Sequence, residues 1–211
     1  MDLTTMRDWI RADLHDEDSA SYRWTNTVLN RHIDRTVREF SMALPRAQTA
    51  TLTTSAGSRD LSIASLTNLV DIEAVEYPTG KYPPVYAPFS LWESTLTLLV
   101  DSTPSGGQAV KVYYGKLHAL DASTSTLPPH LEDLVAAGGA GYAAVEWASF
   151  ATNRVNVGGE AVWRHYLTWG QQRLAFFNQR LTKLSRRGSL RAQRLYGPAH
   201  SKPSQSLVVG P

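Results

Sequence analysis

Hydrophobic residues recur every three to four positions along the first 44 residues, which is the period of amphipathic helices. The first such stretch covers residues 4–14 and gives way to a polar, acidic run. The second covers residues 25–44, with Thr25 as a capping residue at its start and Pro45 directly after its end. The pattern therefore predicts two helices, each with one buried face.

The period changes to two between residues 48 and 117, where Thr, Ile and Val dominate. Turn residues at 103–107, including two glycines, predict a hairpin between the last two strands of this region. This region therefore predicts an inserted antiparallel β module, either a small sheet or a barrel-like unit. The expected strands are 49–54, 61–64, 70–75, 86–91, 95–101 and 109–115.

Helical spacing returns after the β module, with helices expected at 128–152 and 160–187. The first of them contains Gly138, Gly139 and Gly141, which together cost about 3 kcal/mol of helix propensity relative to alanine. A close approach by another helix would offset that cost. We therefore expect an α+β fold, with a helical body that carries an inserted β module.

The last segment, residues 188–211, is rich in glycine and proline and is expected to be an extended basic tail, with 1–187 as the folded body. Part of it, residues 189–196, has the composition of a short basic helix.

The composition is that of an ordinary soluble globular protein, with 42% hydrophobic and 19% charged residues. No apolar run approaches the ~18–20 residues that cross a bilayer, and the acidic N-terminal stretch does not resemble a signal peptide. We therefore expect no membrane partner and no export by that route. The absence of cysteine excludes disulfides and thiolate chemistry.

Residues that could perform catalysis or bind a metal form no recognisable motif. The acidic run Asp16, Glu17 and Asp18 offers oxygen ligands, but its spacing does not match a calcium-binding loop, so we interpret it as a solvated turn. His32 and His165 fit packing or interface positions better than ligand positions. We expect a protein that is not an enzyme and that has no cofactor and no metal.

The charges are distributed unevenly along the chain. The chain holds 21 basic and 19 acidic residues, yet residues 161–211 contain nine of the basic and none of the acidic ones. Basic side chains near a helix C-terminus complement the helix dipole, but this does not explain why they continue into the tail. The basic segment therefore predicts an anionic partner, either nucleic acid phosphate or an acidic protein surface.

Aromatic residues leave a further alternative open. Six tryptophans are most simply interpreted as core and interface anchors. Trp92, Tyr82 and Tyr86 in the β region could instead form a carbohydrate- or receptor-binding surface.

In the order of its predicted elements and in several local stretches, the sequence resembles the head-to-tail adaptor proteins of tailed bacteriophages, also called connector proteins. No single motif carries the resemblance, which spans roughly residues 10–185. The stretches that carry it are Leu14–Glu17, Tyr22–Thr25, Leu29–Phe40, Gly57–Ile63, Val75–Pro78, Leu127–Leu134 and Arg164–Tyr166.

The resemblance implies a structural virion protein of the neck, which assembles in the host cytoplasm as a homo-oligomeric ring, typically of twelve copies, around the channel for genome ejection. The implied partners are further copies of the chain, the portal protein, a tail or nozzle protein and, transiently, DNA. Gly138, Gly139, Gly141 and Tyr142 would lie on a ring-packing helix. The expected portal or DNA-channel contacts are Arg186, Arg187, Arg191, Arg194 and Lys202. A nucleic-acid-binding protein with a basic tail is the alternative.

Overall fold

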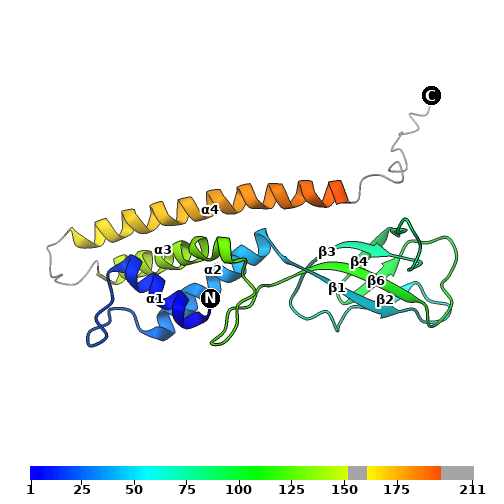
Figure 1. Ribbon diagram of the computed structural model, residues 1–211, viewed down its shortest axis with the longest axis horizontal. Helices are drawn as coiled ribbons and strands as arrows, with labels where there is room; N and C mark the ends of the chain where they lie inside the picture. The colour runs from blue at the N-terminus through cyan, green and yellow to red at the C-terminus, as the bar shows by residue number, and fades with distance from the viewer. Residues whose placement is uncertain (152–160, 196–211) are drawn as a thin grey trace, which may run out of the picture.

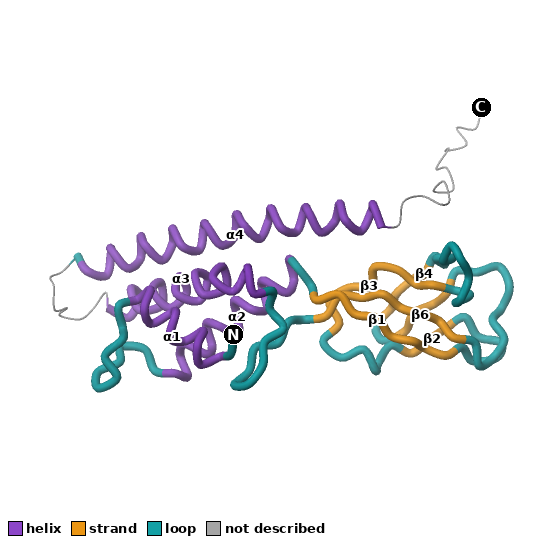
Figure 2. The backbone as a smooth tube through the Cα atoms, viewed as in Figure 1, coloured by secondary structure: helices purple, strands orange, loops and turns teal. Residues whose placement is uncertain are grey.

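A computed structural model describes residues 1–151 and 161–195, the last ten of these by backbone alone. Helices occupy one end of the elongated molecule and strands the other (Figures 1 and 2). This confirms the α+β fold with an inserted β module. The helices are α1 (Leu3–Leu14), α2 (Asn26–Ala43), α3 (Glu132–Ala151) and α4 (Val162–Leu195), with a 3-10 turn η1 (Pro129–Leu131) before α3.

The helical body is built around α3, which contacts α1, α2 and α4. The side chain of Thr25 accepts a hydrogen bond from the Val28 N–H and caps α2 as expected. Four-residue spacing then places Leu29, Ile33 and Val37 on one face, and all three are buried. The helices before and after the β module therefore share one hydrophobic core.

The glycines of α3 allow the chain's own helices to approach closely. A Cβ atom at Gly138 would lie 2.6 Å from the Thr36 side chain of α2, and one at Gly139 would lie 2.7 Å from Ile10 of α1. A Cβ at Gly141 would lie 3.2 Å from the Gly170 carbonyl oxygen of α4. The expected close approach of another helix is thus confirmed and occurs within one chain.

The last helix is longer than its sequence pattern indicates. We expected it to end near residue 187, but α4 continues through Gly188 to Leu195 without a break. One glycine costs a helix only about 1 kcal/mol, and the leucine, arginine, alanine and glutamine after it are strong helix formers. The expectation of an extended tail is therefore wrong for 188–195, and the short basic helix expected at 189–196 is found over 189–195, as the end of α4. Residues 196–211 lie outside the described residues.

The β module consists of two three-stranded antiparallel sheets with orders β1-β6-β3 and β2-β5-β4. Five expected strands match closely, while the strand expected at 86–91 begins only at Phe89, and Tyr86 makes a single bridge to Glu76. Leu96, Leu98, Val110 and Val112 form much of the core between the sheets. The strands are β1 (Arg46–Thr53), β2 (Asp60–Ser62), β3 (Leu69–Glu76), β4 (Phe89–Trp92), β5 (Thr95–Leu98) and β6 (Ala109–Lys116).

The predicted hairpin between the last two strands is wrong. β5 pairs with β2 and β4, whereas β6 pairs with β1 and β3, so the loop at 99–108 crosses from one sheet to the other. The turn residues were identified correctly, but a turn signal does not determine which strands become hydrogen-bonded neighbours.

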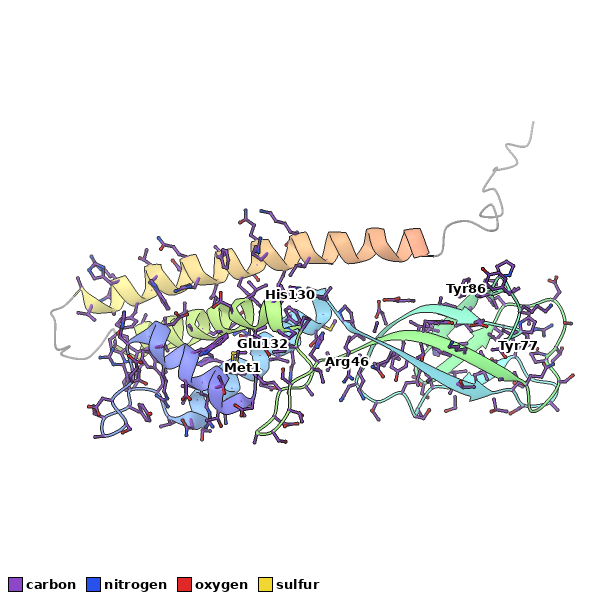
Figure 3. All side chains as sticks on the ribbon, in the orientation of Figure 1. Met1, Arg46, Tyr77, Tyr86, His130 and Glu132 are labelled. Carbon is purple, nitrogen blue, oxygen red and sulfur yellow. The ribbon has the colours of Figure 1, made fainter. Side chains whose placement is uncertain are left out.

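The β module joins the helical body through two adjacent chain segments, one before β1 and one after β6. Arg46, labelled at this junction in Figure 3, is the register partner of Lys116. Beyond β6, the His118 N–H donates to Ser41 Oγ of α2 (2.9 Å), and His118 Nε2 lies 3.1 Å from the Leu44 carbonyl oxygen. These contacts fix the root of the module to the end of α2.

Candidate interaction surface on the C-terminal helix

Helix α4 packs one face on α3 and exposes the rest. Phe177 and Leu181 are buried, and Tyr166, Trp169 and Leu174 are half-buried. Arg164, His165, Arg180 and Lys183 are exposed. No acidic residue occurs anywhere in this 34-residue helix.

The contacts between α3 and α4 show where α4 loses its support. Gly138 faces Phe177, Gly141 faces Leu174, and the helices are antiparallel, so the start of α3 lies opposite about residue 182. At the end of α2, Ala43 shares a hollow with Leu181 and Ser185 of α4. Helix α4 therefore extends about 20 Å beyond α3, and we call its last ten residues, 186–195, the overhang. Figure 1 shows this end of α4 reaching toward the β module.

Four of the predicted contact residues, Arg186, Arg187, Arg191 and Arg194, are positions on the overhang. The fifth, Lys202, lies outside the described residues. At 100° per residue, most basic positions of α4 fall within an arc of about 80° along one side of the helix. This basic stripe consists of Arg173, Arg180, Lys183, Arg187, Arg191 and Arg194.

The described part of the basic stripe is weakly paired. Arg173 contacts Asp13 at 3.5 Å, and both side chains are more than a third exposed. Arg180 and Lys183 have no acidic partner among the described residues. Sequence reasoning identified the charge but missed the stripe, because its spacing is visible only if one helix runs through Gly188.

The residues expected to pack a ring lie mostly inside the chain. Gly138, Gly139 and Gly141 are buried between helices of the same subunit, which accounts for their small size. The half-buried Tyr142 donates a hydrogen bond from its hydroxyl to Glu39 Oε2 (2.6 Å), and burial with this partner raises the pKa of Tyr142 to about 12. A contact of α3 with a neighbouring subunit stays a prediction.

The acidic side chains in the turn after α1 form hydrogen bonds and an ion pair with other groups of the same chain. Asp16 is buried, pairs with Arg11 at 2.5 Å and accepts hydrogen bonds from the N–H groups of Arg23 and Trp24. Asp18 accepts from the Ser21 hydroxyl and the Ala20 N–H, and these bonds lower the pKa of Asp18. Within residues 1–151 and 161–195, no cluster of three His, Asp or Glu side chains is placed to hold a metal ion.

Three of the aromatic side chains surround a cation from the same chain. The guanidinium of Arg23 lies 4.7 Å from the Trp147 ring centroid and 5.4 Å from that of Tyr166, and it donates to the Tyr166 hydroxyl (2.6 Å). Trp24 completes the cluster and donates from Nε1 to the Ala143 carbonyl (3.1 Å). These rings fasten the turn between α1 and α2 onto α3 and α4.

The two histidines that we interpreted as packing or interface residues differ in exposure. His32 is buried and bonds through Nε2 to Glu146 of α3. Burial lowers the pKa of His32, and the hydrogen bond and charge of Glu146 oppose that shift. His165 is exposed and lines a hollow of about 260 Å³ beside Asp13 and His15. His32 therefore fits the packing interpretation.

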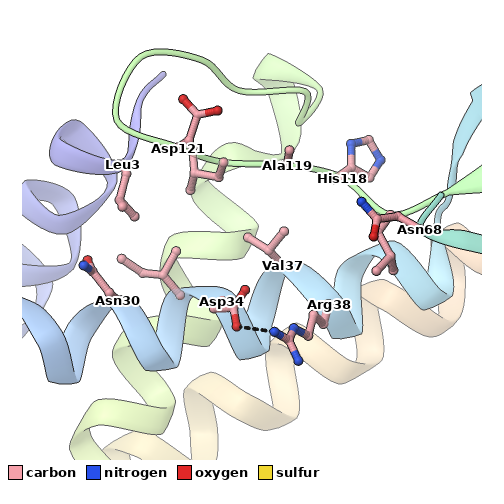
Figure 4. Close-up of a pocket in the computed structure, with 12 residues that line it drawn as sticks. Leu3, Asn30, Asp34, Val37, Arg38, Asn68, His118, Ala119 and Asp121 are labelled. Carbon is pink, nitrogen blue, oxygen red and sulfur yellow. Dashed lines mark ion pairs between the residues drawn. The ribbon is translucent and has the colours of Figure 1, made fainter.

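An open hollow of about 610 Å³ lies where the helical body meets the β module (Figure 4). Asp34 and Arg38 on its rim pair with each other at 2.8 Å. Asn30 Oδ1 is the one buried side-chain oxygen or nitrogen atom without a hydrogen-bond partner in the described part of the chain. One unsatisfied acceptor in a wide hollow does not define a ligand.

The aromatic residues proposed as a binding surface on the β module are divided between the loop that joins β3 to β4 and the end of β4. Tyr82 is 99% exposed in the proline-rich loop after β3, and Trp92 is 81% exposed at the end of β4. Tyr86 is half-buried, with its ring edge-on to Tyr113 at 6.1 Å. Two of the three residues are therefore accessible to a partner.

In the described part of the chain, no helix combines the length and the hydropathy needed to cross a bilayer. No family model matches this chain, and no curated protein matches it either.

Proposed function

We propose that this chain is a subunit of a head-to-tail adaptor of a tailed bacteriophage, a structural protein that forms a ring between the portal and the tail. The observation that carries the proposal is the overhang of α4. A helix that extends beyond its own bundle and bears four arginines with no acidic residue has a surface suited to an acidic partner. In this proposal the partner is the portal, and the DNA channel lies beside it.

The arrangement of the rest of the chain supports the same proposal. The helical body anchors α4 up to about residue 185, and the β module projects from the C-terminal end of α2, the end toward which the overhang reaches. One subunit can then contact the portal through the overhang and a tail protein through the β module. A ring of about twelve copies follows from the resemblance to adaptor proteins.

The proposal is tested with a chain truncated after Ser185 and with purified portal protein of the same phage. The overhang lies beyond α3, so truncation should leave the thermal midpoint of the body unchanged. It should abolish co-sedimentation with the portal and the ring seen beneath the portal by electron microscopy. Docking of the truncated chain at wild-type level would refute the role of the overhang.

A second pair of variants distinguishes the effect of charge on portal binding from the effect of helix length. Replacing the four overhang arginines with glutamine keeps the helix and removes its charge, and should weaken portal binding at least tenfold. The matched control replaces four exposed arginines elsewhere and should bind normally. The overhang set is Arg186, Arg187, Arg191 and Arg194, and the control set is Arg31, Arg38, Arg46 and Arg164.

The same basic stripe favours one alternative, binding to nucleic acid. A protein that neutralises several phosphates loses affinity steeply as salt rises. Retardation of duplex DNA that is lost between 50 and 200 mM salt (roughly the range in which such contacts weaken), combined with no portal binding, would favour the alternative over the adaptor.

A further inference from the structure

Strand β1 has the one long and regular outer edge among the described strands. The outer strands of the two sheets are β1, β3, β2 and β4. β2 and β4 have only three and four residues. β3 shifts register twice against β6. The Ala87 N–H donates to the carbonyl of Val75 in β3, and this bond covers part of the outer edge of β3. β1 pairs with β6 at all eight positions without a shift.

The hydrogen-bond pattern shows which backbone groups β1 leaves open. Thr54, directly after β1, donates its N–H to the Gln108 carbonyl and accepts from the Gly107 N–H, so both its groups point toward the β6 side. Since successive residues of a strand point to opposite edges, alternate residues of β1 point away from β6. They are Ala47, Thr49, Thr51 and Thr53, all exposed, and in the described part of the chain their outward N–H and C=O groups form no hydrogen bond, although β2 lies near part of β1.

The core beneath this edge is incompletely covered. Val110, Val112 and Tyr114 of β6 face the core and are buried, whereas Ala50 and Leu52 of β1 face the same core and are only half-buried. A further strand beside β1 would cover these apolar groups and satisfy the open backbone groups. Long exposed edges of this kind are usually blocked by charges, proline or bulges, and residues 47–53 contain none of these.

We infer that β1 pairs antiparallel with β1 of a second copy of this chain, about a two-fold axis that passes beside Ala50. The other three outer strands are short, bulged or partly covered, so the best match for one open edge is the same edge of another copy. In this register Thr49 faces Thr51 of the partner, and Ala47 faces its Thr53. Threonine pairs of this kind stabilise adjacent strands, and no like charges come opposite each other.

This inference goes beyond the proposed adaptor function and does not depend on it. A two-fold pair joins identical surfaces and is closed, whereas a ring joins two different surfaces. The pair is therefore a distinct association of the chain through the β module, separate from the overhang of α4.

A disulfide cross-link tests the register. The chain has no cysteine, so Ala50→Cys introduces one thiol per chain, and the two thiols meet at a non-hydrogen-bonded position whose spacing suits a disulfide. We expect most of the variant to run as a disulfide dimer on a non-reducing gel. The control Ala47→Cys should run as a monomer on the same gel, because its two thiols would be roughly 20 Å apart in the paired chains and could not form a disulfide. Failure of Ala50→Cys to cross-link, or equal cross-linking by Ala47→Cys, would overturn the inference.

A proline on the outer edge of β1 tests the pairing without introducing a disulfide. The Thr51 N–H points away from β6, so Thr51→Pro removes an outward donor and leaves the β1–β6 hydrogen bonds in place. By analytical ultracentrifugation, the wild type and the control Thr51→Val should sediment as dimers and Thr51→Pro as a monomer with an unchanged circular dichroism spectrum. A Thr51→Pro dimer, or a wild type that is not dimeric at any concentration studied, would contradict the pairing. A wild type that assembles with the portal yet shows no β1 pairing would refute only this inference.

Discussion

The crossing of α3 and α4 at Gly141 and Gly170 predicts that Gly170→Ala destabilises the protein, although alanine is the better helix former. A Cβ atom at residue 170 would lie 2.9 Å from the Gly141 carbonyl oxygen, 2.9 Å from Val145 Cγ2 and 3.1 Å from Ala144 Cβ. The first of these is a backbone atom that cannot rotate away. The methyl group can therefore be accommodated only if the two helices move apart.

Two opposing free energies determine the size of the effect. Replacing glycine with alanine within a helix contributes about 1 kcal/mol of stability. Overpacking a close-packed contact costs about 1–3 kcal/mol, and a contact with backbone lies toward the upper end of that range. We expect a net loss of about 1–2 kcal/mol, and a thermal midpoint lower by about 2–8 °C for a chain of this size.

Urea unfolding followed by tryptophan fluorescence measures the change. The matched control is Ala175→Gly, an exposed position five residues further along the same helix, which should lose about 1 kcal/mol through propensity alone. If Gly170→Ala is instead more stable than wild type by about 1 kcal/mol, the close crossing imposes no constraint and the reasoning fails.

Three further predictions concern the helical body. Asp16→Asn should cost about 3–5 kcal/mol in urea unfolding because it leaves the buried Arg11 without a counter-charge, and a loss below 1 kcal/mol would contradict the buried pair. Burial lowers the pKa of His32 and His118, so the free energy of unfolding should be fully retained above the usual pKa of 6.5 and should fall below it, by at most about 1.4 kcal/mol per pH unit for each group. Urea midpoints at pH 7.5 and 5.5 would show this, and a midpoint that is constant or rises toward pH 5.5 would refute it. Thr25→Ala should lower the thermal midpoint through loss of the α2 cap, worth about 1 kcal/mol, whereas Thr25→Ser should retain it.

Local chemistry made the helices and most strands predictable. The Thr25 cap, Pro45 and the four-residue apolar spacing of α2 act within one element, and its observed bounds agree with the pattern. The sheet pairing was not predictable in this way, because β5 and β6 find partners up to 70 residues away in the chain.

The candidate surface was only half visible in the sequence. The acid-free basic run can be counted directly. The overhang depends on how α4 is aligned against α3. The close approach at Gly170 sets this alignment, and no sequence pattern singled out that glycine. An isolated glycine in a helical pattern normally indicates only reduced helix propensity.

The junction between the two halves of the molecule has an evolutionary consequence. Arg46 and Lys116 begin and end the β module as partners on adjacent strands, so the insertion enters and leaves the helical body at points about 5 Å apart. A different domain with similarly close ends could replace it without altering the path of α2 or α3. Gene exchange at these two positions would give the chain a new distal surface while its helices and basic stripe stay the same.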